Sequence, residues 1–97
     1  GGGSEIISVG RNCLIGANAG VGFPLADGCI VEAGLYVTAG TKVNVLDNSG
    51  NIDRSVKARE LSAVPDRLFR RNSLSGAVEC VPLNNAVTLN EELHSHN

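Results

Sequence analysis

The chain has 97 residues, with eight Lys or Arg and ten Asp or Glu, and a formal net charge of −2. One small domain fits this length, and no stretch approaches the roughly 18 apolar residues that span a bilayer, so no membrane partner is expected. Nucleic acid is a poor candidate too, because the chain is acidic overall and contains only two Phe, one Tyr and no Trp for stacking on bases.

The first half of the chain repeats every six residues. Six successive glycines follow this spacing: Gly10, Gly16, Gly22, Gly28, Gly34 and Gly40. A strand has a period of two and an α-helix of about 3.6, and collagen needs glycine at every third position. A six-residue unit is typical of a β-helix solenoid. The alternative, short strands in a glycine-rich sandwich, gives no reason for glycine to stay in six-residue phase.

Two columns of the repeat are expected to point into a narrow interior, because they are apolar and lie two residues apart. The first column is Ile7, Cys13, Ala19, Leu25, Val31, Val37 and Val43. The second column, before each glycine, is Val9, Ile15, Val21, Asp27, Ala33 and Ala39, of which only Asp27 is polar. Three units make one turn of a triangular prism, which predicts two coils, residues 7–24 and 25–42. Solenoids usually need at least three repeats, so we expect the C-terminal end of a longer solenoid or a chain stabilised by oligomerisation.

The periodicity stops after Val45, and the rest of the chain is expected to cap the open end of the coils. The predicted elements are a surface loop at residues 46–51, a short strand or helix at 56–64, two strands at 67–73 and 77–83 joined as a hairpin across Ser75 and Gly76, and a short helical turn after Asn90.

The residues alone assign no catalytic group. Cys13, Cys29 and Cys80 form no CxxC pair and no zinc-ligand pattern, so reduced thiols of a cytoplasmic protein are the simplest interpretation. The two histidines, His94 and His96, lie in the last four residues. The chain contains no Ser-His-Asp set, no P-loop and no GxGxxG motif outside the six-residue register.

Basic residues are concentrated in one stretch. Six of the eight lie within eighteen positions: Arg54, Lys57, Arg59, Arg67, Arg70 and Arg71. A solvated surface that pairs with acidic residues elsewhere is one interpretation. A phosphate-binding patch is the other, because arginine matches phosphate oxygens with two hydrogen bonds and lysine supplies a point charge.

The repeat over residues 5–45 resembles the left-handed parallel β-helix of the hexapeptide-repeat acyltransferases. The runs CLIGANAGVGFPLADGCIVEAGLYVTAGTKV, SVKARELS, LFRRNSLSGAVE and LNEELH narrow the resemblance to the C-terminal part of the tetrahydrodipicolinate N-succinyltransferases, most nearly the actinobacterial type. The resemblance implies an all-β chain with about two left-handed coils at residues 1–45, and a loop, a hairpin-like cap and a short terminal helical turn at 46–97.

The resemblance also implies a function. Enzymes of this family transfer a succinyl group from succinyl-CoA to the amino group of tetrahydrodipicolinate, in diaminopimelate and lysine biosynthesis. They are homotrimers with active sites between neighbouring β-helices. The catalytic glutamate of the family, and the acidic residues linked with magnesium, correspond to positions upstream of this chain. We therefore expect no catalytic or metal-binding residue here, and no turnover by this chain alone.

Binding positions for CoA carry over where the sequence matches the family. They are Ala17, Glu32, Ala33, Gly40, Lys57, Arg70, Arg71, Asn72 and Ser73. Small residues let the pantetheine arm of CoA lie close to the backbone, and the charges of Lys57, Arg70 and Arg71 suit its phosphates. The loop at 46–55 is longer than the family pattern, which leaves the path before Lys57 open.

Other functions stay open. A hexapeptide acyltransferase that acts on serine or a nucleotide sugar often relies on a histidine within the coils, where this chain has none. The same absence argues against a γ-type carbonic anhydrase, which holds zinc through such histidines. A non-catalytic trimerisation module would have no affinity for CoA.

Overall fold

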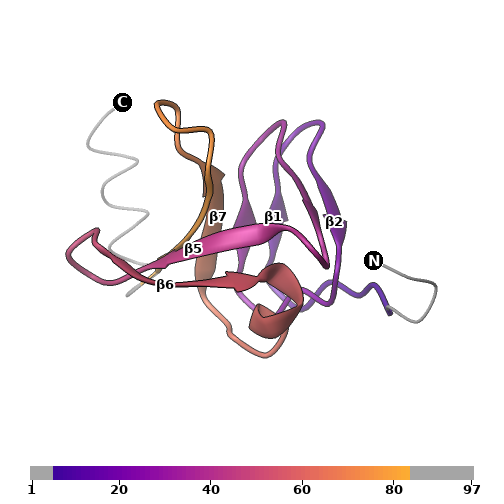
Figure 1. Cartoon of the computed structure of the whole chain (residues 1–97). Coiled ribbons are helices and arrows are strands. Elements are labelled where there is room, and N and C mark those ends of the chain that lie inside the picture. The colour runs from indigo at the N-terminus through magenta and orange to yellow at the C-terminus, as the bar shows by residue number, and fades with distance from the viewer. Residues whose placement is uncertain (1–5, 84–97) are drawn as a thin grey trace, which may run out of the picture.

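The structure is a computed structural model that describes residues 6–83, and over this range the chain is all-β, as predicted (Figure 1). The strands are β1 (Leu14–Ile15), β2 (Gly20–Gly22), β3 (Ile30–Val31), β4 (Tyr36–Thr38), β5 (Lys42–Leu46), β6 (Ile52–Lys57), β7 (Arg67–Arg71) and β8 (Val78–Pro82), with a 3₁₀ helix, η1 (Ala58–Leu61), after β6. In the described part of the chain, no helix is long and apolar enough to cross a membrane. The helical turn predicted after Asn90 lies outside the described residues.

Short strands of the first half stack in parallel at a constant offset of 16 residues. Val9 bridges Leu25, β1 pairs with β3, and β2 pairs with β4 through Val21 and Val37. The stacked coils are therefore present, but the prediction of coils at residues 7–24 and 25–42, an 18-residue step, is wrong.

Backbone corners with positive φ recur at the same 16-residue step. Asn12 and Asn18 both have φ of 58°, and Gly28 and Gly34 have φ of 72° and 77°. Each asparagine lies 16 residues before one of these glycines, and both residue types tolerate the left-handed region. The same two corners are therefore formed by asparagine in the first coil and by glycine in the second. Uniform glycine spacing hides this register.

The chain leaves the stack at β5 and later returns to it. Antiparallel β5 and β6 form a hairpin that runs across the stack in Figure 1 and projects beyond it. After η1, β7 joins the parallel sheet beside β3, with Ile30 opposite Leu68. Asp66, with φ of 56°, precedes β7 at the place that Gly28 holds before β3. The second half therefore supplies a further strand of the coil sheet.

The predicted loop and hairpin in the second half are confirmed. Residues 47–51 form a turn in which the Asp47 carboxylate accepts the backbone N–H groups of Ser49 and Asn51 at 2.8 and 3.0 Å. The segment predicted as strand or short helix contains the end of β6 and then η1. Strands β7 and β8 are antiparallel, with Phe69 opposite Cys80, and β8 also pairs in parallel with β5.

One predicted interior column is confirmed in the second coil, where Leu25, Val31, Val37 and Val43 are all 3% exposed or less. The column before the glycines is wrong in part, since Val9 is 53% exposed and Ala33 is also exposed. Three side chains outside the two predicted columns also lie in the interior. They are Phe23, Cys29 and Leu35, all buried.

All three cysteines are free thiols, and two of them are buried in the core. Burial raises the pKa of the Cys29 thiol and raises that of Cys80 to about 11. Cys13 lies one coil step before Cys29 and is partly exposed. The thiolate is the reactive form of cysteine, so burial and the raised pKa should protect Cys29 and Cys80 together.

We expect iodoacetamide at pH 8 to modify Cys13 in the folded protein and to reach Cys29 and Cys80 only after denaturation. At that pH, a thiol with a pKa near 11 is thiolate in about one molecule in a thousand. Peptide mass spectrometry measures the three sites separately, and Cys13→Ser should leave the folded protein unlabelled. Equal labelling rates at Cys13 and Cys80 would contradict the buried position of β8.

Candidate functional site

A cavity of about 400 Å³ and another of about 350 Å³ open on the described surface, and the second gathers five of the nine predicted CoA-binding residues. Its walls are Glu32, Arg70, Arg71, Asn72, Ser73, Leu74 and Glu79. Parallel pairing of β3 with β7 brings these segments together, because it places their carboxyl ends at the same edge of the sheet. The backbone N–H of Glu32 donates to the Phe69 carbonyl at 2.9 Å. Residues that lie 38 positions apart in the chain therefore share one cavity.

The Glu32 side chain joins the two segments a second time. Its Oε2 atom accepts the backbone N–H of Arg71 at 2.9 Å. Ala33 lies beside it and, with Glu32 and Arg71, lines an adjoining hollow of about 160 Å³. Ala17 lies one coil step earlier, where its carbonyl accepts the N–H of Gly34 at 2.8 Å. The small side chains of Ala17 and Ala33 thus form an edge, one coil step apart, beside the hollow that Arg71 lines.

Glu79 on β8 was not predicted as a site residue. It is charged yet buried among the described residues, with 6% of its surface exposed. Its carboxylate accepts Arg70 Nε at 3.0 Å and Asn72 Nδ2 at 3.2 Å, and so orients two predicted site residues. A hairpin centred on Ser75 and Gly76 would put Arg70 opposite Val81, whereas the observed partner is Glu79. The two-residue shift in register is why the sequence did not indicate this contact.

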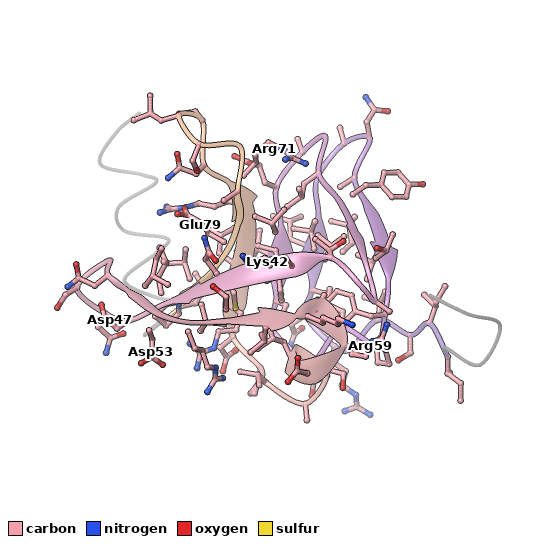
Figure 2. All side chains as sticks on the ribbon, in the orientation of Figure 1. Lys42, Asp47, Asp53, Arg59, Arg71 and Glu79 are labelled. Atoms are coloured by element: carbon pink, nitrogen blue, oxygen red, sulfur yellow. The ribbon has the colours of Figure 1, made fainter. Side chains whose placement is uncertain are left out.

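The two arginines of the cavity differ in how they are held. Arg70 has a side chain 42% exposed, and its ion pair with Glu79 uses Nε. Arg71 is exposed and donates from Nη1 to the Gly76 carbonyl at 2.6 Å (Figure 2). Asn72 Oδ1 accepts the N–H groups of Leu74 and Ser75, which fixes the turn above the cavity. The arrangement offers guanidinium and hydroxyl donors on a rigid support, which suits binding of an anionic group.

The other two predicted residues lie elsewhere. Lys57 ends β6 opposite Lys42 of β5, and Gly40 is in the corner before β5. Arg59, not predicted as a site residue, contacts this corner: its Nε donates to the Ala39 carbonyl at 3.4 Å. Figure 2 shows Arg59 well separated from Arg71. The structure therefore divides the nine residues into a group around Glu32 and Arg71 and a pair, Gly40 and Lys57.

Residues 6–83 contain no group of three or more His, Cys, Asp or Glu side chains placed to hold a metal ion.

The sequence of the chain matches known proteins. Residues 6–39 match the family described as the hexapeptide repeat of succinyl-transferase. Over all 97 residues, the chain is 61% identical to the 2,3,4,5-tetrahydropyridine-2,6-dicarboxylate N-succinyltransferase of Vibrio cholerae and 62% identical to that of Pseudomonas aeruginosa. The chain is thus similar over its whole length to a part of these N-succinyltransferases.

The chain spans 28% of the length of these curated N-succinyltransferases. A solved structure named as a 2,3,4,5-tetrahydropyridine-2-carboxylate N-succinyltransferase from Campylobacter jejuni matches with a TM-score of 0.72 and 40% identity, over 84% of this chain and 24% of that one. The resemblance to N-succinyltransferases inferred from the sequence is confirmed. The likeness to the actinobacterial type stays a prediction.

Proposed function

We propose that this chain is the CoA-binding β-helix part of an N-succinyltransferase that transfers succinyl from succinyl-CoA to the amino group of tetrahydrodipicolinate. The observation that carries the proposal is the identity of 61–62% over the whole chain, together with a cavity in which Glu32 meets residues 70–73. In the transfer, the acceptor nitrogen bonds to the thioester carbon, the C–S bond breaks and CoA leaves as the thiol.

The proposed role of these residues is to hold CoA in place, because positioning supplies much of the rate in such transfers. Arg70 and Arg71 would take phosphate oxygens, and the edge formed by Ala17 and Ala33 would lie against the pantetheine arm. Backbone N–H groups of the coils could stabilise the oxyanion of the thioester. Gly40 and Lys57 would meet a different part of the ligand, or a ligand bound to a neighbouring subunit. The catalytic group would come from outside these residues.

The finer architecture is part of the same proposal. We place a left-handed β-helix at residues 1–45 and a loop and cap at 46–97. The constant parallel offset and the recurring corners support stacked coils, and the left hand is supported by the hexapeptide match. A homotrimer would supply the cleft between neighbouring β-helices. A cytoplasmic location is supported by the three free thiols. Magnesium, where required, would bind outside this chain.

Calorimetric titration of the full chain with CoA tests the proposal. We expect Arg71→Gln to weaken CoA binding by about tenfold, the size of a lost charge-assisted hydrogen bond. Arg71 is the better position for this test, since replacing Arg70 would also leave the buried Glu79 carboxylate without its partner. Arg11→Gln is the matched control, because it removes the same charge from an exposed residue of the first coil, outside the cavity.

Three results would overturn the proposal. Absence of CoA binding to the chain would favour the trimerisation module. Equal effects of Arg71→Gln and Arg11→Gln would show that only net charge matters. Tighter binding of acetyl-CoA than of succinyl-CoA would favour an acyltransferase with another acyl donor.

A further inference from the structure

The cavity of about 400 Å³ is separate from the proposed CoA site and shares no lining residue with it. It lies where the β5–β6 hairpin, η1 and the β7–β8 pair meet. Apolar walls come from Val45, Leu61 and Val64, and two arginines, Arg54 of β6 and Arg67 of β7, complete it. A volume of this size is typical of small-molecule sites, which combine apolar walls with a few polar groups.

Arg67 presents an unused hydrogen-bond donor. Its Nε atom is buried and has no hydrogen-bond partner among the described residues. A buried N–H of a charged group that lacks an acceptor is unfavourable. Arg67 also lines the cavity, so the charge of an anion bound there would offset part of that cost.

Arg54 lines the same cavity from β6, which is separated from β7 in the sheet by β8 and β5. The charges of Arg67 and Arg54 lower the pKa of the Cys80 thiol, against the larger effect of burial, which raises it. Cys80 itself lines the cavity. Within residues 6–83, neither Arg54 nor Arg67 forms an ion pair. Two positive groups from different elements thus face one volume, an arrangement that an anion between them would stabilise.

Two carboxylates also lie at this cavity, and their positions limit the ligand. Figure 2 shows Asp47 and Asp53 toward the outer end of the β5–β6 hairpin. Asp47 accepts two backbone N–H groups of the loop, so its carboxylate is engaged there. Asp53 is exposed on β6, next to Arg54. Its negative charge should weaken the attraction for anions without removing it.

We propose that this cavity binds the oxyanion of a small organic molecule, a carboxylate or a phosphate ester, between Arg54 and Arg67. The apolar walls would contact the hydrocarbon part of the ligand. This site goes beyond the proposed succinyl transfer and does not depend on it, because none of its residues belongs to the proposed CoA site.

Nuclear magnetic resonance titration of the full chain tests the site, with succinate and inorganic phosphate as separate probes at fixed ionic strength. We expect the Arg67 Nε–H resonance to shift and saturate with at least one of them, and the better probe identifies the oxyanion. Arg54→Gln should weaken that binding by about tenfold, and Asp53→Asn should strengthen it severalfold. Arg11→Gln is the control of equal charge and should leave it unchanged.

Some results would overturn the site. Neither probe giving a saturable shift would do so, and so would equal weakening by Arg54→Gln and Arg11→Gln. The site would also be overturned if the Arg67 Nε–H resonance were that of a hydrogen-bonded group before either probe is added. A carboxylate of the chain would then occupy the cavity. If CoA binds in the calorimetric titration but neither succinate nor phosphate shifts the Arg67 resonance, the proposed function stands and only this second site is rejected.

Discussion

Replacement of Gly16 by alanine is expected to lower the free energy of unfolding by about 3 kcal/mol or more, at the upper end of overpacking effects. For a domain of this size the melting temperature would fall by more than about 12 °C. The physical reason is space between coils. A Cβ atom on Gly16 would lie 2.6 Å from Ala33 Cα and closer still to Ala33 N.

Relief of this overlap requires the coils to separate, because the atoms in the way belong to the backbone. The same backbone carries the ladder: the Gly16 N–H donates to the Val31 carbonyl at 2.8 Å. Separation would weaken that hydrogen bond and move Ala33, beside Glu32. A partly folded variant should therefore also lose the geometry of the proposed CoA site.

Two other glycines serve as controls in chemical denaturation followed by circular dichroism. At Gly40 the nearest atom to an added Cβ is Arg59 Nη2 at 3.7 Å, so Gly40→Ala should change stability by less than about 0.5 kcal/mol. Gly34 has open space but a φ of 77°, so Gly34→Ala should cost about 1–2 kcal/mol through backbone strain. Similar losses at Gly16 and Gly40 would show that the coils are not stacked as described.

This difference among glycines explains what the sequence predicted and where it failed. Six-residue spacing correctly predicted stacked parallel coils and the buried column that includes Val31 and Val37. It gave the wrong coil step because glycines with different roles share that spacing. Gly16 provides space, whereas Gly28 provides a left-handed corner. Alignment of Asn12 with Gly28 would have revealed the 16-residue step.

The candidate site was predictable only by resemblance. Glu32 and Arg70 meet because β7 returns to the coil sheet after the excursion through β5, β6 and η1. No periodicity in that excursion indicates where the chain will rejoin the sheet. Asp66, at the place equivalent to Gly28, is a local sign of the return, but aspartate is too common in turns to predict parallel pairing. Glu79 was missed because its contacts depend on the hairpin register.

The second large effect is expected at Phe69, where β7 attaches the second half of the chain to the coils. The ring is fully buried and packs edge-on against Phe23, with centroids 5.7 Å apart and an interplanar angle of 68°. In the backbone ladder, Phe69 lies between Val31 of β3 and Cys80 of β8. Loss of the ring would leave a hole between the coil sheet and the hairpin.

Phe69→Ala should therefore lower the free energy of unfolding by about 3–5 kcal/mol, the range for replacing a buried aromatic residue by alanine. Phe69→Leu should cost less, because leucine refills much of the volume and needs no new polar contact. Leu74→Ala is the surface control: Leu74 is 97% exposed, so its truncation should change stability by less than about 0.5 kcal/mol. Urea denaturation measures the free energy of unfolding of all three variants.

A double-mutant cycle of Phe69→Leu with Phe23→Leu should show coupling between the two rings. Independent effects at the two positions would contradict their edge-on contact. The backbone N–H of Glu32 donates to the Phe69 carbonyl, so Phe69→Ala should weaken CoA binding as well as lower stability. Leu74→Ala is a control for stability alone, because Leu74 lines the proposed CoA cavity.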